Sequence, residues 1–318
     1  MKQLLERAIK KILPIPFLSL LCCFLFMPSA NAQFTPWEEL LFDNGHLVIE
    51  TEVDGVRGFS IVDTGAQMTG INIRFLRSIE PSFREGGVVQ VRGLFGVSNR
   101  RSHSEIPVTV LGVETEFNGA VEMNLGPPGL QLLLGANFLD ALVFQFDYPN
   151  RRMRAIAREN LNLKKIRNVK AKRDPSGGSP IVRVRLNDEK NTWLTLDTGN
   201  SGGIVLDRKI ATKLKWLERY PTVESVSAGV ITAGRMEEFT LPSMTFGDYV
   251  VVNPLISVPG ANEDTELFKK ESHTYSRIER GRQQAEGLLG YDVLRNFIVT
   301  IDYKKGYVHI EPGSPEQE

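Results

Sequence analysis

Two stretches of the chain share one pattern of apolar and polar positions. In the first, residues 47–53 and 59–62 predict two strands around an Asp-Gly turn. In the second, residues 181–186 and 193–196 predict two strands around an Asn-Asp turn. Each stretch therefore predicts a β-hairpin, and the second strand of each hairpin runs into the same three residues, Asp-Thr-Gly.

The Asp-Thr-Gly triplet belongs to a longer repeated pattern. It begins at Asp63 and again at Asp197, and a Leu-Leu-Gly motif follows each copy, ending at Gly135 and at Gly290. An Asp-Tyr pair then comes twelve residues after that glycine in both halves. Motifs that recur in the same order with matching spacing indicate an internal duplication.

The rest of the pattern is mainly that of short strands. Asp207 predicts the start of one helix, because Ile210, Leu214 and Leu217 would share one of its faces. We expect an all-β protein with a few short helices and two similar lobes related by a pseudo-two-fold axis. Further short strands are predicted at residues 88–91, 108–111, 230–231, 239–241 and 250–252.

The first 32 residues have the character of a secretory signal peptide. A basic start precedes an apolar run over residues 17–27, and Ala30-Asn31-Ala32 fits a cleavage site. An uncleaved membrane anchor is the alternative, although the apolar run is short for a membrane span. Export would place the chain most simply in a bacterial periplasm, with no integral membrane anchor after cleavage.

Composition narrows the possible chemistry. The chain has 38 basic and 38 acidic residues, so no global charge draws it to nucleic acid. Its two cysteines, Cys22 and Cys23, lie in the signal segment. Disulfides, thiolate metal ligands and a cysteine nucleophile are therefore excluded from the remaining chain. No HExxH metal motif and no phosphate-binding loop occurs.

Two polar segments interrupt the repeat. Residues 151–173 contain ten basic residues and one acid, which favours either contact with an anionic surface or, as we expect, a solvated segment. Residues 261–286 predict an exposed excursion whose role the sequence does not give. The expected organisation is a signal peptide at 1–32, a lobe at 33–158, a basic linker at 159–178, a second lobe at 179–313 and a tail at 314–318.

Paired Asp-Thr-Gly loops bring two carboxyl groups together if the halves meet at a pseudo-two-fold axis. Two carboxylates a few ångströms apart cannot both ionise, so one pKa rises and the other falls. Such a pair can hold a water molecule, with one carboxylate acting as base and the other as acid. That arrangement can add water to an amide without a metal.

Here the chain resembles the retropepsin-like (retroviral-type) aspartic proteases. Asp-Thr-Gly-Ala after an apolar strand, followed by an apolar pair and glycine, carries the resemblance, and the two copies look like a tandem single-chain form. The resemblance implies acid-protease-like β-barrel lobes, a polypeptide substrate, no metal or other cofactor, and a monomer acting as a pseudo-dimer. It makes Asp63 and Asp197 the catalytic pair of an aspartic endopeptidase. Support of the active-site loops falls to Thr64, Gly65, Ala66, Thr198, Gly199, Asn200, Gly135 and Gly290.

The resemblance also implies a flap, a hairpin that covers the site. The first candidate is the Gly-Leu-Phe-Gly sequence formed by Gly93, Leu94, Phe95 and Gly96, and its counterpart contains Gly229 and Val230. An ordinary turn is the competing interpretation of both segments.

One position departs from the family pattern, which usually has Ala or Ser after the glycine. Ala66 fits, whereas Asn200 does not. An amide there could bond a carboxylate oxygen and alter the two pKa values, or it could mark a degraded site. Ser201 supplying the outer hydrogen bond is a third possibility. A catalytically inactive peptide-binding relative of the same fold is therefore the alternative function.

A serine protease is a weaker hypothesis. The residues around Ser201 look like a nucleophile loop, but the repeat accounts for Asp197 better. The four histidines, His46, His103, His273 and His309, have no convincing catalytic context in the sequence.

Overall fold

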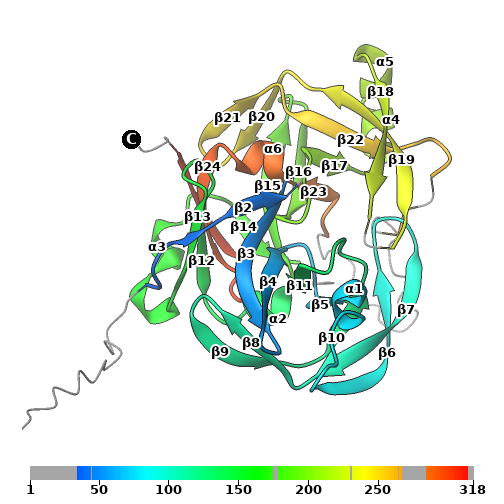
Figure 1. The fold of residues 1–318 in the computed structure, drawn as a ribbon. Coiled ribbons are helices and arrows are strands. Elements are labelled where there is room, and N and C mark those ends of the chain that lie inside the picture. The colour runs from blue at the N-terminus through cyan, green and yellow to red at the C-terminus, as the bar shows by residue number, and fades with distance from the viewer. Residues whose placement is uncertain are drawn as a thin grey trace, which may run out of the picture. The chain divides into compact units, whose positions relative to one another are not determined.

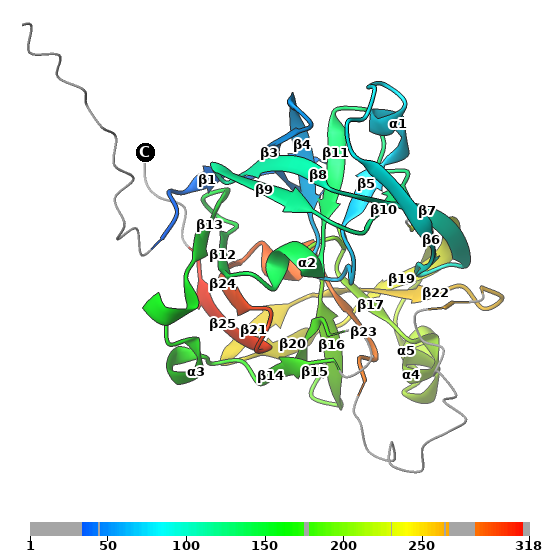
Figure 2. The same ribbon diagram turned by 90° about the horizontal axis from the view of Figure 1, so that it is seen from below.

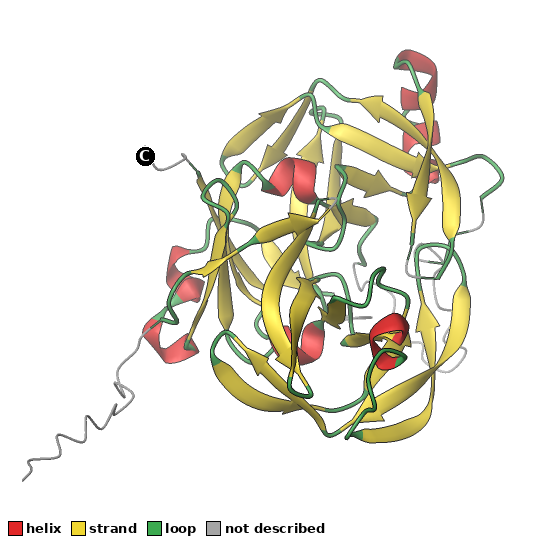
Figure 3. Cartoon of the chain, in the orientation of Figure 1, coloured by secondary structure: helices red, strands yellow, loops and turns green. Residues whose placement is uncertain are grey.

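A computed structural model describes residues 34–43, 45–174, 178–229, 231–263, 265–266 and 284–313. Residues Gln33–Glu318 form one compact unit. The predicted signal peptide and the tail at 314–318 lie outside the described residues, as does most of the excursion at 261–286. Strands dominate the described chain and its helices are short (Figure 3), so the predicted all-β class is confirmed.

The first half of the chain forms a ten-stranded sheet in the order β6-β7-β10-β5-β11-β4-β3-β8-β9, with β2 also paired to β3 (Figure 1). Its strands are β2 (Leu41–Asp43), β3 (His46–Val53), β4 (Val56–Val62), β5 (Gly70–Asn72), β6 (Arg84–Arg92), β7 (Val97–Ser104), β8 (Ile106–Val110), β9 (Val113–Phe117), β10 (Ala120–Met123) and β11 (Leu130–Leu134).

The second half repeats that topology strand for strand, in the order β18-β19-β22-β17-β23-β16-β15-β20-β21, with β14 also paired to β15. Its strands are β14 (Ala171–Arg173), β15 (Pro180–Leu186), β16 (Lys190–Leu196), β17 (Ile204–Leu206), β18 (Val223–Ala228), β19 (Ala233–Thr240), β20 (Ser243–Phe246), β21 (Tyr249–Val252), β22 (Leu255–Pro259) and β23 (Gly287–Leu289). Identical strand order in the two halves agrees with the duplication predicted from the motifs. Both sheets are open among the described strands, so the lobes are not closed barrels.

A five-stranded sheet joins the two halves. Its order is β1 (Glu38–Glu39), β13 (Arg152–Ile156), β12 (Val143–Asp147), β24 (Phe297–Asp302) and β25 (Tyr307–Pro312). In the central antiparallel pair, Val143 lies opposite Asp302 and Asp147 lies opposite Ile298. The two Asp residues are repeat equivalents, and so are Val143 and Ile298, so this pairing has the reciprocity of a two-fold axis.

The predicted hairpins form around turns of the expected type. Asp54 and Gly55 have φ of 52° and 75°, and Asn187 and Asp188 have φ of 46° and 53°. Two successive positive φ values are typical of the type I′ turn, whose twist matches that of antiparallel strands. β3 and β4 therefore form the first hairpin, and β15 and β16 form the second.

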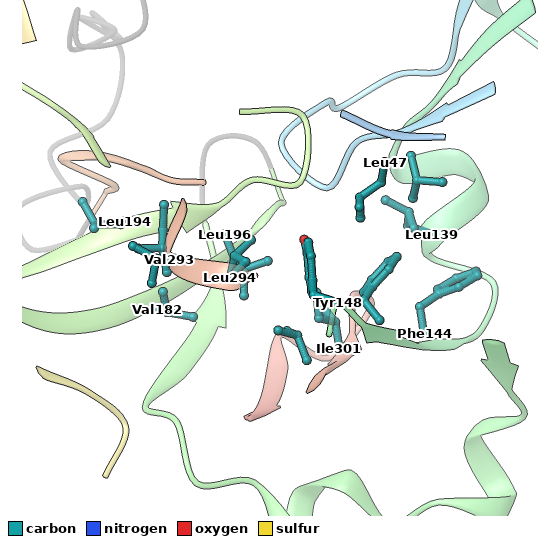
Figure 4. Packing of buried hydrophobic residues seen from close by; sticks show 14 of the residues in the cluster. Leu47, Leu139, Phe144, Tyr148, Val182, Leu194, Leu196, Val293, Leu294 and Ile301 are labelled. Atoms are coloured by element: carbon teal, nitrogen blue, oxygen red, sulfur yellow. The ribbon is translucent and has the colours of Figure 1, made fainter. Parts of the chain in front are cut away.

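The hydrophobic core is continuous from one half to the other. Figure 4 shows Leu196 and Leu294 on one side of Tyr148, with Leu47 and Phe144 on its other side. All five side chains are buried in the same cluster. Because the Asp-containing loops follow strands that carry this core, the packing fixes the two loops against each other.

The short helices are α1 (Ile73–Leu76), α2 (Ala136–Leu139), α3 (Leu163–Ile166), α4 (Arg208–Lys213), α5 (Trp216–Arg219) and α6 (Tyr291–Leu294), with a 3₁₀ turn at Arg158–Asn160. Asp207 caps α4 as predicted, and its side chain accepts a hydrogen bond from the Lys209 N–H at 3.0 Å. The helix is shorter than predicted, because Lys215 has a φ of 57° and the chain restarts as α5. The strand predicted at 230–231 is wrong at Ile231, which lies in the connection between β18 and β19.

The basic segment contains ordered structure and structural partners. α3 and β14 lie within it. Arg152 pairs with Asp147 at 2.9 Å and Arg158 pairs with Asp302 at 2.9 Å. The Arg154 guanidinium lies 4.3 Å from the centre of the Trp37 ring. These contacts within the fold explain several of the positive charges without an external anion.

Candidate active site

Each triplet aspartate is held at the end of a hairpin strand by the partner strand beside it. Asp63 follows β4, and its N–H donates to the Leu134 carbonyl of β11 at 3.1 Å. Asp197 follows β16, and its N–H donates to the Leu289 carbonyl of β23 at 3.0 Å. The Leu-Leu-Gly motif therefore anchors the Asp-Thr-Gly motif in both halves, which explains why the two motifs repeat together.

The threonines of the two triplets join the loops by four reciprocal hydrogen bonds. The Thr64 N–H donates to Thr198 Oγ1 and the Thr198 N–H donates to Thr64 Oγ1, both at 3.0 Å. Thr64 Oγ1 donates to the Leu196 carbonyl at 2.7 Å, and Thr198 Oγ1 donates to the Val62 carbonyl at 2.6 Å. Both threonines are at most 2% exposed. Each hydroxyl acts as donor and acceptor, so the side chains fix the relative position of the loops.

The carboxyl groups of Asp63 and Asp197 lie close enough for each to shift the pKa of the other. Asp197 is 8% exposed and Asp63 is partly buried. Asp63 Oδ1 accepts hydrogen bonds from the N–H groups of Gly65 at 2.8 Å and Ala66 at 3.0 Å. Asp197 Oδ1 accepts one from Gly199 at 2.9 Å. The Asn200 N–H also lowers the pKa of Asp197, so backbone N–H groups face both carboxyl groups.

Burial and mutual repulsion set the protonation of this pair. Burial raises the pKa of Asp63, while the hydrogen bonds from Asp197, Gly65 and Ala66 oppose that rise. Burial raises the pKa of Asp197 well above its ordinary value, and the charge of Asp63 raises it further. Asp63 is thus the better site for the anion and Asp197 the better site for the proton.

The triplet glycines lie against the opposite carboxyl groups. A Cβ on Gly65 would overlap the carboxyl group of Asp197, and a Cβ on Gly199 would overlap that of Asp63. Glycine is required here by close approach, since these residues let each loop reach the aspartate of the other.

The glycines of the Leu-Leu-Gly motif lie against the same loops. A Cβ on Gly135 would overlap the Met68 carbonyl, and one on Gly290 would overlap the backbone and amide of Asn200. The residues that follow donate back to the loops, Ala136 to the Ala66 carbonyl at 3.0 Å and Tyr291 to the Asn200 carbonyl at 2.9 Å. Ala66 and Asn200 are therefore equivalent in backbone contacts despite their different side chains.

The Asn200 side chain bonds within its own loop. Its Nδ2 donates to the Gly203 carbonyl at 3.0 Å, and its Oδ1 accepts from the Gly202 N–H at 3.1 Å. The amide thus supplies a local brace that the shorter Ala66 does not. Ser201 is exposed, and its backbone and Cβ lie beside Gly45, at the start of β3.

The two predicted flap segments meet each other at the tips of equivalent hairpins. Figures 1 and 2 show the β6-β7 hairpin and the β18-β19 hairpin converging. A Cβ on Gly96 would lie 3.7 Å from Ile231 Cγ2, and a Cβ on Gly229 would lie 4.0 Å from Leu94 Cβ. Gly93 closes the first tip by donating to the Gly96 carbonyl at 3.1 Å. Val230 lies outside the described residues.

The sequence motifs did not identify the tyrosines of the repeated Asp-Tyr pair as neighbours of the paired aspartates, although Tyr148 interacts with the charge of Asp197 and Tyr303 with that of Asp63. Both side chains are buried, Tyr148 at 4% exposed and Tyr303 at 1%. Burial raises the pKa of Tyr303 to about 12, and the Tyr303 hydroxyl lies 3.0 Å from Ser179 Oγ. Burial, together with the charge of Asp197, raises the pKa of Tyr148 well above its ordinary value. Their recurrence at the same position in both halves is the sequence signal that could have placed them near the two aspartates.

Within the described ranges, no group of three or more His, Cys, Asp or Glu side chains is placed to hold a metal ion. No helix in the same part of the chain has both the length and the apolar composition to cross a bilayer. No protein-family model and no curated protein matches the sequence.

Proposed function

We propose that the protein is an aspartic endopeptidase of the retropepsin-like type, which hydrolyses internal bonds of extended polypeptides. The observation that carries the proposal is the pairing of two carboxyl groups: Asp63 and Asp197 come from equivalent loops, each lies against the triplet glycine of the other loop, and each shifts the pKa of the other. Keeping two acids together away from water is costly unless the pair has a use. The reciprocal threonine bonds support a site whose geometry is fixed before substrate arrives.

In the proposed mechanism, the carboxylate of Asp63 takes a proton from a water molecule whose oxygen bonds to the carbonyl carbon of the substrate. The carboxylic acid of Asp197 gives its proton to the carbonyl oxygen, and a tetrahedral diol results. Proton transfer from Asp63 to the amide nitrogen then allows the C–N bond to break, while Asp197 recovers a proton from a diol hydroxyl. The starting protonation state is restored, so no metal ion or covalent enzyme intermediate enters the cycle.

The assignment of roles follows from burial and charge, because backbone N–H groups face both carboxyl groups, those of Gly65 and Ala66 for Asp63 and those of Gly199 and Asn200 for Asp197. Burial raises the pKa of Asp197 well above its ordinary value. The pKa of Asp197 is raised further by the charge of Asp63. The active form has one shared proton, so we expect cleavage to decline as the pH rises through the raised pKa of Asp197.

The test is cleavage of a mixed peptide library between pH 3 and 8 by the chain from residue 33 to 318. Asp63→Asn should abolish cleavage, whereas the matched substitution Asp188→Asn, at an exposed turn, should leave it unchanged. Cleavage that survives Asp63→Asn would contradict the proposal. Peptide binding without cleavage by the unsubstituted chain would favour the inactive peptide-binding alternative.

We also propose that the protein is exported to the periplasm and works as a monomer. The signal-like segment supports export, and the two halves supply both aspartates from one chain. The mass of the protein in solution tests the second point, and a mass of two chains would contradict it. N-terminal sequencing of periplasmic material tests the first, with Gln33 as the expected first residue.

A further inference from the structure

The tip of the β6-β7 hairpin carries an aromatic side chain that is almost completely buried. Phe95 is only 3% exposed, although it occupies a turn at the end of a long hairpin. It packs in a cluster with Val205 and Met236, and Leu94 and Leu288 lie against the same cluster. We call this group the Phe95 cluster. Val205, Met236 and Leu288 all belong to the opposite half of the chain, so the hairpin places its side chain across the molecule.

The opposite hairpin does the same in reverse. Ile231, between β18 and β19, packs against a cluster of the first half that contains Val91, Val121, Met123 and Leu133. We call this group the Ile231 cluster. Each hairpin therefore inserts one apolar side chain into the other half.

The two clusters occupy equivalent positions beside the paired aspartates. Leu133 and Leu288 are the same residue of the repeated Leu-Leu-Gly motif. The residue after each of them accepts the hydrogen bond of an aspartate N–H, Leu134 for Asp63 and Leu289 for Asp197. The loop residue Ala66 also packs against the Ile231 cluster. The filled positions thus adjoin the reacting groups on both sides.

Space for the Phe95 ring depends on a glycine. A Cβ on Gly234 of β19 would overlap the ring at three of its carbon atoms. The backbone also fastens the tip, because the Glu266 N–H donates to the Leu94 carbonyl at 3.0 Å. The fit is that of an aromatic side chain in a formed apolar recess, which is also what a substrate side chain would need.

We propose that Phe95 and Ile231 occupy the positions of the substrate side chains on either side of Asp63 and Asp197. The protein's own side chains then block the substrate site until the two hairpins separate. This inference rests on the proposed function. A peptide with an aromatic residue can bind only when Phe95 leaves its cluster, so apparent affinity is lowered by the fraction of molecules that are open. Phe95 is then a residue that competes with substrate.

The experiment measures binding separately from turnover. Both proteins carry Asp63→Asn to prevent cleavage, and the probes are fluorescein-labelled random octapeptides with either Phe or Ala fixed at the fourth position. Adding Phe95→Ala should tighten anisotropy-measured binding of the Phe pool by about tenfold and change the Ala pool much less. The matched control Val226→Ala, an exposed residue (71%) on the other hairpin, should change neither.

Unchanged or weaker binding of the Phe pool by Phe95→Ala would overturn the proposal, because the ring would then help to hold substrate. A second variant covers the case in which Phe95→Ala misfolds. Leu94→Cys with Gly229→Cys places two Cβ atoms about 4.0 Å apart, which suits a disulfide, in a chain from residue 33 that has no other cysteine. The oxidised form should fail to bind the Phe pool and recover on reduction, whereas equal binding by both forms would contradict hairpin separation. Either result stands whether or not the unsubstituted chain cleaves peptides.

Discussion

The reciprocal threonine bonds give the sharpest stability prediction. Thr198→Val keeps the shape of the side chain but removes the hydroxyl that donates to the Val62 carbonyl at 2.6 Å and accepts from the Thr64 N–H at 3.0 Å. Both partners are in a buried environment, and leaving a buried polar group unsatisfied costs about 1–3 kcal/mol. Two groups lose their partner, so the free energy of unfolding should fall by about 2–6 kcal/mol.

Thr69→Val is the matched control for this substitution. Thr69 is 1% exposed, and its Oγ1 has no hydrogen-bond partner in the described structure. Replacing this hydroxyl with a methyl group removes an unsatisfied polar atom, so we expect a change of about 0–1 kcal/mol toward greater stability.

Urea denaturation followed by tryptophan fluorescence measures both variants. The m value should stay constant while the midpoint shifts. A loss below about 1 kcal/mol for Thr198→Val, or an equal loss for Thr69→Val, would show that the interlocked hydroxyls do not fix the loops.

Three further predictions concern crowding, pH and the join between the halves. Gly199→Ala should destabilise the protein by about 1–3 kcal/mol and abolish cleavage, because its methyl group would overlap the Asp63 carboxyl group. Gly87→Ala is the matched control, since no atom lies within 4 Å of its added Cβ, and it should be nearly neutral in the same urea and cleavage assays. Burial raises the pKa of Asp197. The stability that protonated Asp197 contributes is therefore complete below the ordinary pKa of 3.8 and is lost as the pH rises through the raised pKa. In urea titrations from pH 3 to 8, the free energy of unfolding should decline less for Asp197→Asn than for the unsubstituted chain. Arg158→Ala should cost about 2–4 kcal/mol in thermal or urea unfolding, because it leaves buried Asp302 without its 2.9 Å ion pair, and a loss below 1 kcal/mol would contradict a role in joining the halves.

Local sequence signals were sufficient for the hairpins. The Asp54-Gly55 and Asn187-Asp188 turns adopt the positive φ values that such residues tolerate, and the strands around them follow the alternation of apolar residues. The duplication was also visible, because equivalent motifs keep their spacing on both sides of the pseudo-two-fold axis.

Contacts between segments that are distant in the chain could not be predicted from the sequence. Nothing local to residue 231 shows that its side chain reaches a cluster in the other half, and the strand that its apolar sequence predicts is wrong. The sheets likewise remain open because their closure depends on pairing at the edges, which hydrophobic alternation does not encode. The partners of Asn200 were also not predictable from the sequence, because its side-chain amide bonds to the backbone of Gly202 and Gly203 and not to a carboxyl group.

In the proposed function, Asp63 and Asp197 act as one catalytic unit. The most direct test compares the peptide-cleavage rates of the unsubstituted chain, Asp63→Asn, Asp197→Asn and the double variant. When two residues act as a unit, removing one of them already removes the contribution of both. Each single substitution should therefore abolish cleavage, and the rate of the double variant should be no lower than that of either single variant. Retention of the unsubstituted rate by either single variant, or losses that multiply in the double, would contradict the shared dyad.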